Sequence, residues 1–275
     1  MSVGAGGIDW ILHWQAMQAA AEAPWGAEAA AEDPWQHRAA RFDRDCRPGA
    51  EVGLEQLRQG VLPTDVVADI GAGTGRHAVP MSRHCAGVIA VEPSPAMRAR
   101  LESRVAAERA SVSLVSAAWP CVIPAVDVAY SCHVVYGVLD IVGFLEQMTR
   151  AARRTCKLLL GLRAPAERVA PVWRAVHGVE RAPRPAALEV LALLHQLGHA
   201  ASLELVPDSE MPVTYLPTDE DLDELCRRLR LAPIESERAR VRDALDAHYP
   251  RSSLDEPWSF GTAGTCAVLQ WRGAA

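Results

Sequence analysis

The sequence predicts an α/β fold built on a mostly parallel sheet, and two observations lead to this prediction. From residue 66 onward, short apolar runs alternate with segments of helical character, which is the pattern of βαβ units. The first apolar run ends in three glycines at alternate positions, as expected where a strand leads into a loop that a ligand approaches closely. A chain of 275 residues, 49% hydrophobic and 23% charged, is long enough for one such core and a covering appendage.

The region before the first apolar run, residues 1–50, is predicted to form a helical and aromatic lid. Residues 8–31 are rich in alanine, and Trp10 and Trp14 stand one helical turn apart, so this stretch should be a helix with an aromatic stripe. Prolines then break the region into short pieces. Its aromatic surface must pack onto the rest of the chain.

Six strands, alternating with helices, are expected in the core that follows. They are predicted at residues 66–70, 88–91, 112–115, 126–131, 157–162 and 201–206. The clearest helix start is Ser94-Pro95, because serine caps a helix well and proline suits its first position; this helix should continue to residue 108. Further helical patterns cover residues 169–177 and 185–197.

The C-terminal part is predicted to be a helical insertion followed by a last strand. Thr218 and the acidic residues after it cap a helix that runs to residue 229, and a second helix covers residues 235–248. Residues 264–271 alternate between two faces, as a final strand does. The domain boundaries that we expect are therefore a core of residues 51–206 and 257–275, interrupted by an insertion at residues 207–256.

The glycine loop follows the first predicted strand and reads Asp69-Ile70-Gly71-Ala72-Gly73-Thr74-Gly75-Arg76. Glycines leave no Cβ in the way, so a nucleoside can lie against the turn while the next helix presents its free N–H groups. Glu92 ends the second apolar run, where a carboxylate can accept both hydroxyls of a ribose. A dinucleotide fingerprint needs a third glycine five places after the first, and Arg76 occupies that position, which disfavours a nicotinamide enzyme.

The Gly-x-Gly-x-Gly spacing after Asp69, together with Val91-Glu92-Pro93-Ser94, resembles the class I S-adenosylmethionine-dependent methyltransferases. The resemblance covers about residues 35–163 and the last strand. It implies a Rossmann-like, seven-stranded, mostly parallel sheet with an antiparallel last strand, plus a helical lid. It also implies S-adenosylmethionine as cofactor and S-adenosylhomocysteine as product, with the glycine loop on the methionine part and Glu92 on the ribose. The cofactor-binding residues expected on this basis are Asp69, Gly71, Ala72, Gly73, Thr74, Gly75, Glu92, Pro93, Ala117, Ala118, Trp119 and Ser131.

One position departs from the family pattern. Many members carry an acidic residue just after the third strand that binds the adenine amino group, whereas this chain has Ser116-Ala117-Ala118-Trp119-Pro120 there. Three interpretations stay open. Trp119 packs against the adenine, or the backbone of Ala117 and Ala118 makes the contact, or Trp119 serves only in packing.

Catalysis of methyl transfer does not require a base, because the reaction is an in-line displacement that depends on holding the acceptor on axis. If the acceptor is a hydroxyl or a thiol, the best-placed catalytic candidates are His133 and Tyr136, which follow the fourth predicted strand and should face the methyl group. No metal is predicted, because the histidines and cysteines show no metal-ligand spacing. The candidates for the substrate pocket are His13, Trp14, Trp173 and His177.

The sequence therefore predicts a methyltransferase enzyme that acts on a small molecule, and its tryptophans favour an uncharged or aromatic acceptor. Trp10 and Trp14 should lie over the cofactor cleft; the alternative is that their helix covers a fixed apolar face of the sheet. The net charge of −6 argues against nucleic acid as a partner, and no apolar run approaches the roughly 20 residues of a membrane span. Scattered cysteines suggest the cytoplasm. The alternative is a non-catalytic or regulatory S-adenosylmethionine-binding protein of the same fold.

Overall fold

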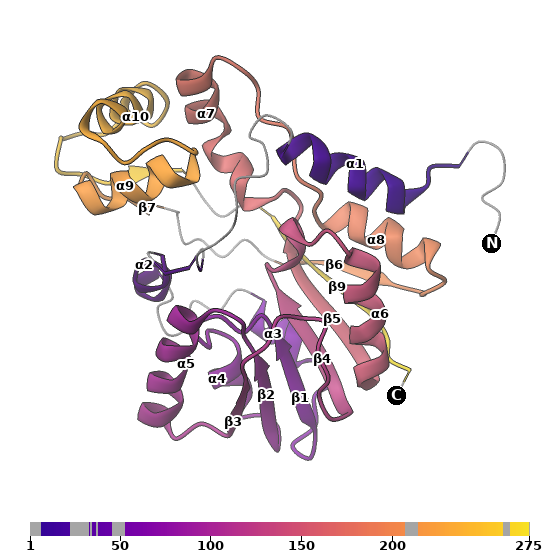
Figure 1. Cartoon of the computed structure of the whole chain (residues 1–275). Helices are drawn as coiled ribbons and strands as arrows, with labels where there is room; N and C mark the ends of the chain where they lie inside the picture. The colour runs from indigo at the N-terminus through magenta and orange to yellow at the C-terminus, as the bar shows by residue number, and fades with distance from the viewer. Residues whose placement is uncertain are drawn as a thin grey trace.

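Seven strands form one sheet in the computed structural model, which describes residues 7–22, 33, 35–36, 38–45, 53–206, 214–260 and 265–274 (Figure 1). The strand order is β3-β2-β1-β4-β5-β9-β6. Neighbours are parallel except at β9, which is antiparallel to both β5 and β6. The predicted fold class is confirmed. The strands are β1 Val66–Ile70, β2 Gly87–Val91, β3 Val112–Val115, β4 Val126–Cys132, β5 Ala152–Gly161, β6 Ser202–Val206 and β9 Cys266–Arg272.

Both faces of the sheet are covered by helices, which explains why its central strands read as continuous apolar runs. Successive β1 residues point to opposite faces: Ala68 and Ile70 join one apolar cluster and Val67 joins another. Helices α1, α6 and α8 cover the first face, as Figure 1 shows, and α3, α4 and α5 cover the second. Their bounds are α1 Trp10–Glu22, α3 Leu54–Arg58, α4 Ala78–Met81, α5 Pro95–Glu108, α6 Ile141–Ala151 and α8 Ala187–Gln196.

Strand β5 begins at Ala152, earlier than the expected start at residue 157. Its first residues include Arg153 and Arg154, and these charged residues do not fit the apolar run that predicts a strand. Their charges are tolerated there because Arg153 lies 3.5 Å from Asp127 and Arg154 pairs with Asp65.

The helix expected after the glycine loop is present as a single turn, α4. Ser82 follows it, and the Ser82 hydroxyl donates to the carbonyl of Val79 at 2.7 Å, which competes with continuation of the helix. The free N–H groups at the start of this short helix stay a predicted part of the site.

The predicted insertion contains α9 Asp219–Arg228 and α10 Glu235–His248, close to the expected helices. Two short strands, β7 Thr214–Tyr215 and β8 Trp258–Ser259, pair at its base, which the sequence did not suggest. The insertion also shares an apolar core with η3 Pro165–Val169 and α7 Ala170–His177, which precede β6 in the chain. We call η3, α7, α9, α10 and the β7–β8 pair the appendage; Figure 1 shows its helices grouped together apart from the sheet.

Parts of all three predicted domains lie outside the described residues: much of the lid at 1–50, residues 51–52, 261–264 and 275 of the core, and residues 207–213 of the insertion. The remaining helix of the lid, α2 Ala39–Asp45, lies between α5 and α9 in Figure 1. No helix in the described part of the chain has both the length and the apolar character needed to cross a membrane.

Candidate active site

The three glycines of the loop all have positive φ, but they serve different purposes. A Cβ on Gly71 would stand 2.4 Å from Cγ2 of Val134, and one on Gly75 would stand 2.4 Å from Cδ1 of Leu101, so these two glycines permit close packing within the protein. Gly73 differs, since the nearest atom to its Cβ position is Cε1 of Phe42, at 3.8 Å. Gly73 is therefore the position where a ligand can approach the backbone.

The loop is fixed to the end of β2 by backbone hydrogen bonds. The N–H groups of Gly71 and Ala72 donate to the carbonyl of Val91 at 2.8 and 3.1 Å. Thr74, in the same loop, is fully buried, and its hydroxyl has no hydrogen-bond partner among the described residues. Buried hydroxyls are normally satisfied, so Thr74 fits a site where a bound molecule or water completes the hydrogen bonding.

Glu92 reaches back from the end of β2 to the glycine loop. Its Oε2 accepts the N–H of Gly73 at 2.8 Å, and its Oε1 accepts the N–H of Ser94 at 2.8 Å. Burial raises the pKa of this carboxyl, while the two backbone N–H groups act in the opposite direction. Each oxygen has a lone pair left for a ligand hydroxyl, as a ribose contact requires. Pro93, the next residue, is exposed.

Asp69 points into the fold. Its side chain is 2% exposed, and its Oδ2 accepts the hydroxyl of Tyr130 at 3.0 Å. Burial raises the pKa of the Asp69 carboxyl to about 7, and the charge of Glu92 adds to the increase. The Asp69 side chain thus ties the loop to β4, and its contact with the methionine part of the cofactor stays a prediction.

The part of the lid that covers the glycine loop is not the part that the sequence suggested. Phe42 on α2 stands over Gly73, and Trp35 packs edge-on against Phe42 with ring centroids 5.7 Å apart. Asp33 accepts the hydroxyl of Ser94 at 2.6 Å, next to Glu92. We call Asp33, Trp35 and Phe42 the cover. These residues have no periodic spacing, so no sequence pattern could have placed them here.

Helix α1 instead belongs to the packed face of the sheet. Trp14 is fully buried in the cluster formed with α6 and α8, and its Nε1 donates to the carbonyl of Val138 at 2.8 Å. The expectation that Trp10 and Trp14 lie over the cofactor cleft was wrong, because this helix buries its aromatic residue against α8 and the segment after β4. His13 is exposed and lies edge-on to Trp10.

Trp173 and His177, the other two pocket candidates, belong to the core of the appendage. Trp173 is buried there, and Nε2 of His177 lies 2.8 Å from the carbonyl of Leu229. The structure thus does not bring the four pocket candidates together.

Around the third and fourth strands, the side chains that we expected to contact cofactor contact protein. Nε1 of Trp119 donates to the carbonyl of Phe144 at 3.1 Å, and the two rings meet edge-to-face, which favours the packing interpretation of Trp119. The hydroxyl of Ser131 is buried and donates to the carbonyl of Ile70 at 2.7 Å, so it ties β4 to β1. Ala117 is half-buried and Ala118 exposed, which leaves their backbone as the candidate adenine contact.

His133 and Tyr136 do meet, directly after β4. Nδ1 of His133 lies 2.9 Å from the Tyr136 hydroxyl, which also accepts the N–H of Gly161 at 2.7 Å. Burial lowers the pKa of His133 to about 4, with the charges of Arg76 and Arg168 acting in the same direction, so the ring is neutral at pH 7. The phenol oxygen accepts a hydrogen bond from the N–H of Gly161, so we assign the phenol O–H as a hydrogen-bond donor to Nδ1. The proton of the neutral imidazole is then on Nε2.

The His133–Tyr136 pair lies against the glycine loop. Ile70 and Ser131 are register partners in β1 and β4, so the two loops leave the sheet side by side. Val134, between the two members of the pair, is the residue that a Cβ on Gly71 would strike. The arrangement brings together a backbone cradle, a carboxylate and a neutral imidazole.

Comparisons with known proteins bear on the domain and the fold. Residues 67–157 match the family model described as a methyltransferase domain. The search of curated protein sequences found no significant match.

Three solved structures are similar in fold. A putative methyltransferase from Bacillus halodurans has a TM-score of 0.55 at 11% identity, covering 81% of this chain and 99% of that one. The YcgJ protein from Bacillus subtilis has a TM-score of 0.54 at 14% identity, covering 81% and 96%. Magnesium protoporphyrin IX methyltransferase from Synechocystis, with bound S-adenosylhomocysteine, has a TM-score of 0.52 at 12% identity, covering 85% and 87%.

Proposed function

We propose that this chain is an S-adenosylmethionine-dependent methyltransferase that methylates a small-molecule acceptor held beside His133 and Tyr136; the match of residues 67–157 to a methyltransferase domain supports this proposal. When bound, the cofactor would supply a methyl group on a positively charged sulfur: a lone pair of the acceptor would form the new bond to carbon, the electron pair of the broken carbon–sulfur bond would stay on sulfur, and an acceptor proton, where there is one, would leave to solvent. The chain itself has to provide binding, alignment and exclusion of water.

The contact between Glu92 and Gly73 carries this proposal. These residues lie 19 positions apart, yet the carboxylate of one accepts the N–H of the other at 2.8 Å. The group suited to ribose hydroxyls and the backbone suited to close approach are therefore side by side. Thr74, with its unsatisfied buried hydroxyl, belongs to the same site.

The His133–Tyr136 pair would orient the acceptor. With the ring proton on Nε2, His133 can donate a hydrogen bond to an acceptor molecule, while the Tyr136 hydroxyl fixes the ring from the other nitrogen. Fixing the ring in this way holds the donor in one direction without a change in protonation. Alignment of this kind is what an in-line displacement requires.

The layers over the site favour a small acceptor. The cover lies on the glycine loop and is joined to the appendage, since Arg41 on α2 lies 2.9 Å from Asp221 and Arg38 lies 2.8 Å from Glu224, both on α9. Two connected layers beside the glycine loop suit a metabolite better than a long polymer.

The test is to incubate the protein with methyl-labelled S-adenosylmethionine and, separately, with the small-molecule, protein and nucleic-acid fractions of a cell extract. We expect S-adenosylhomocysteine and a labelled product only with the small-molecule fraction. Label in either macromolecular fraction would contradict the proposed acceptor class. Cofactor binding without product in any fraction would indicate the alternative, a non-catalytic binding protein.

A further inference from the structure

Four arginines converge where α1, η3, α7 and α9 meet; we call Arg181, Arg184, Arg228 and Arg230 the arginine cluster. Arg184 donates to Oε1 of Gln18 at 2.8 Å, and both Arg184 and Arg230 pair with Glu22 on α1. The guanidinium of Arg181 lies over the ring of Trp173, 4.7 Å from its centroid.

The cluster has more positive than negative charge. Two of its arginines share the single carboxylate of Glu22. Glu224, the carboxylate whose charge acts on Arg228, already pairs with Arg38 at 2.8 Å. Among the described residues no carboxylate lies within ion-pair distance of Arg181, and its one hydrogen bond, to the carbonyl of Ala166, is 3.5 Å long.

Arg181 is thus held among like charges. Burial and the charges of Arg228, Arg184 and Arg230 together lower its pKa to about 10. Crowding cations in a partly buried position is unfavourable unless an anion offsets it. This crowding stands out in a chain whose net charge is −6.

The cluster is connected to the His133–Tyr136 pair through two intermediates, η3 and Gln18. Arg181 and Arg228 both donate to carbonyls of η3, the segment that follows β5, and the charge of Arg168 on η3 lowers the pKa of His133. On the other side, Gln18 holds Arg184 through its oxygen and donates from Nε2 to the carbonyl of Tyr136 at 2.9 Å. An anion at Arg181 would therefore belong to the acceptor, since the glycine loop takes the cofactor.

We propose that the methyl acceptor carries an anionic group, a carboxylate or a phosphate monoester, that Arg181 binds with Arg184 and Arg230 beside it. The proposal rests on the proposed methyl transfer and narrows its acceptor class. A guanidinium suits both anions because its N–H groups bind two oxygens at once. The proposal replaces the uncharged or aromatic acceptor expected from the tryptophans, because Trp14 is buried and Trp173 lies beneath Arg181.

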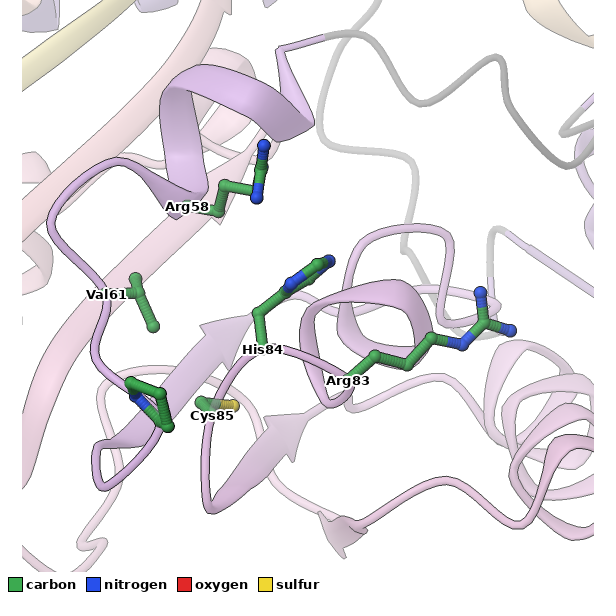
Figure 2. A pocket seen from close by; sticks show the side chains of 6 residues that line it. Arg58, Val61, Arg83, His84 and Cys85 are labelled. Atoms are coloured by element: carbon green, nitrogen blue, oxygen red, sulfur yellow. The ribbon is translucent and has the colours of Figure 1, made fainter.

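A second basic region is a weaker candidate. A pocket of about 320 Å3, lined by Arg58, Val61, Pro63, Arg83, His84 and Cys85, opens near the amino ends of β1 and β2, away from the glycine loop (Figure 2). Arg58 pairs with Glu55 at 2.6 Å and Arg83 with Glu108, and in Figure 2 the Arg83 side chain extends away from Arg58. The two arginines of this pocket each pair with a carboxylate, whereas Arg181 does not pair with any in the described part of the chain.

The test uses the full chain saturated with S-adenosylhomocysteine and four probes: benzoate and phenyl phosphate, with benzamide and phenol as their neutral counterparts. Binding is measured by calorimetry. We expect at least one anion to bind at least tenfold more tightly than its counterpart, and the stronger of the two identifies carboxylate or phosphate as the natural group. Its affinity should fall as salt is added.

Arg181→Met should weaken anion binding at least tenfold, while Arg174→Met, on the exposed end of a pair with Glu180, should not. Because Arg181 is crowded by like charges, its variant should melt no lower than the wild-type protein, whereas a structural arginine would lower the melting temperature. An Arg181→Met variant that does not fold would overturn the proposal. An affinity of the wild-type protein for the anion that does not change with added salt would also overturn it.

Three other outcomes would also overturn the proposal: equal binding of anions and neutral counterparts, no anion binding at all, or a loss of S-adenosylhomocysteine affinity in Arg181→Met. The last would assign the cluster to the cofactor. Failure of the proposed function looks different, since the wild-type protein would then not bind S-adenosylhomocysteine or would form no product.

Discussion

At the scale of single residues, we propose that Glu92 contacts the cofactor directly. Glu92→Ala should raise the dissociation constant for S-adenosylhomocysteine at least tenfold, because each lost charge-assisted hydrogen bond is worth about 1.5 to 3 kcal/mol. Calorimetric titration measures the change. Glu102→Ala, an exposed glutamate on α5, is the matched control and should bind like the wild-type protein. Equal affinity of the Glu92 variant would mean that another residue holds the ribose.

Tyr136 is expected to act through His133. Tyr136→Phe removes the hydroxyl that contacts Nδ1 of His133 and accepts the N–H of Gly161, so the imidazole loses its fixed direction. We expect kcat to fall by about 10- to 100-fold, as misplacement of a reacting group does, with unchanged affinity for S-adenosylhomocysteine. His133→Ala and the double variant should fall to a similar level, because the two side chains act as a unit. An unchanged kcat in Tyr136→Phe would remove the pair from the mechanism.

Asp69 should make folding stability depend on pH. Its pKa is about 7 in the folded protein against an ordinary value of 3.8, so between about pH 4 and 7 the folded state binds the proton more tightly than the unfolded chain. The contribution of Asp69 to the free energy of unfolding should therefore decrease as pH rises through this range. Urea unfolding of the wild-type protein and of Asp69→Asn at pH 5, 6, 7 and 8 tests this. The free energy of unfolding of the wild-type protein should fall relative to that of Asp69→Asn as pH rises. A difference that stays constant with pH would contradict this expectation.

At the scale of elements, α1 is a packing helix. Trp14→Ala should lower the free energy of unfolding by about 3 to 5 kcal/mol, as expected when a large buried aromatic residue is truncated. Folded Trp14→Ala should keep its affinity for S-adenosylhomocysteine, because Phe42 rather than Trp14 lies over Gly73. Trp10→Ala, at a partly buried position of the same helix, should cost less stability. Reduced cofactor affinity in folded Trp14→Ala would return α1 to the role of a lid.

The sequence predicted elements well where one local pattern determines the structure. The runs that became β1 and β3 have the expected bounds: β1 is largely buried, and β3, at the edge of the sheet, is a short run with one exposed serine. The start of β5 was missed because ion pairs with residues outside that strand stabilise Arg153 and Arg154. The length of α4 was not predicted, and a side-chain hydrogen bond from Ser82 to the carbonyl of Val79 lies at its end.

At the scale of the whole molecule, the candidate site could be predicted only in part. Gly73 and Glu92 lie in short motifs with fixed positions at strand ends, so their proximity follows from the topology of a parallel sheet. The cover and the arginine cluster join segments far apart in the chain: Phe42 meets Gly73, and Arg184 meets Gln18. Contacts of this kind depend on how α2 and the appendage pack, which no local pattern encodes.

The central claim is that S-adenosylmethionine lies against Gly73, and binding of S-adenosylhomocysteine to Gly73→Val tests it most directly. Gly60→Val is the matched control, since Gly60 also has positive φ but no atom within 4 Å of its Cβ position. Both variants carry a similar backbone cost, about 1–2 kcal/mol. We expect micromolar binding, about −8 kcal/mol, for the wild-type protein and Gly60→Val, and none for Gly73→Val. A Gly73→Val protein that melts cooperatively and binds as tightly as Gly60→Val would contradict the claim.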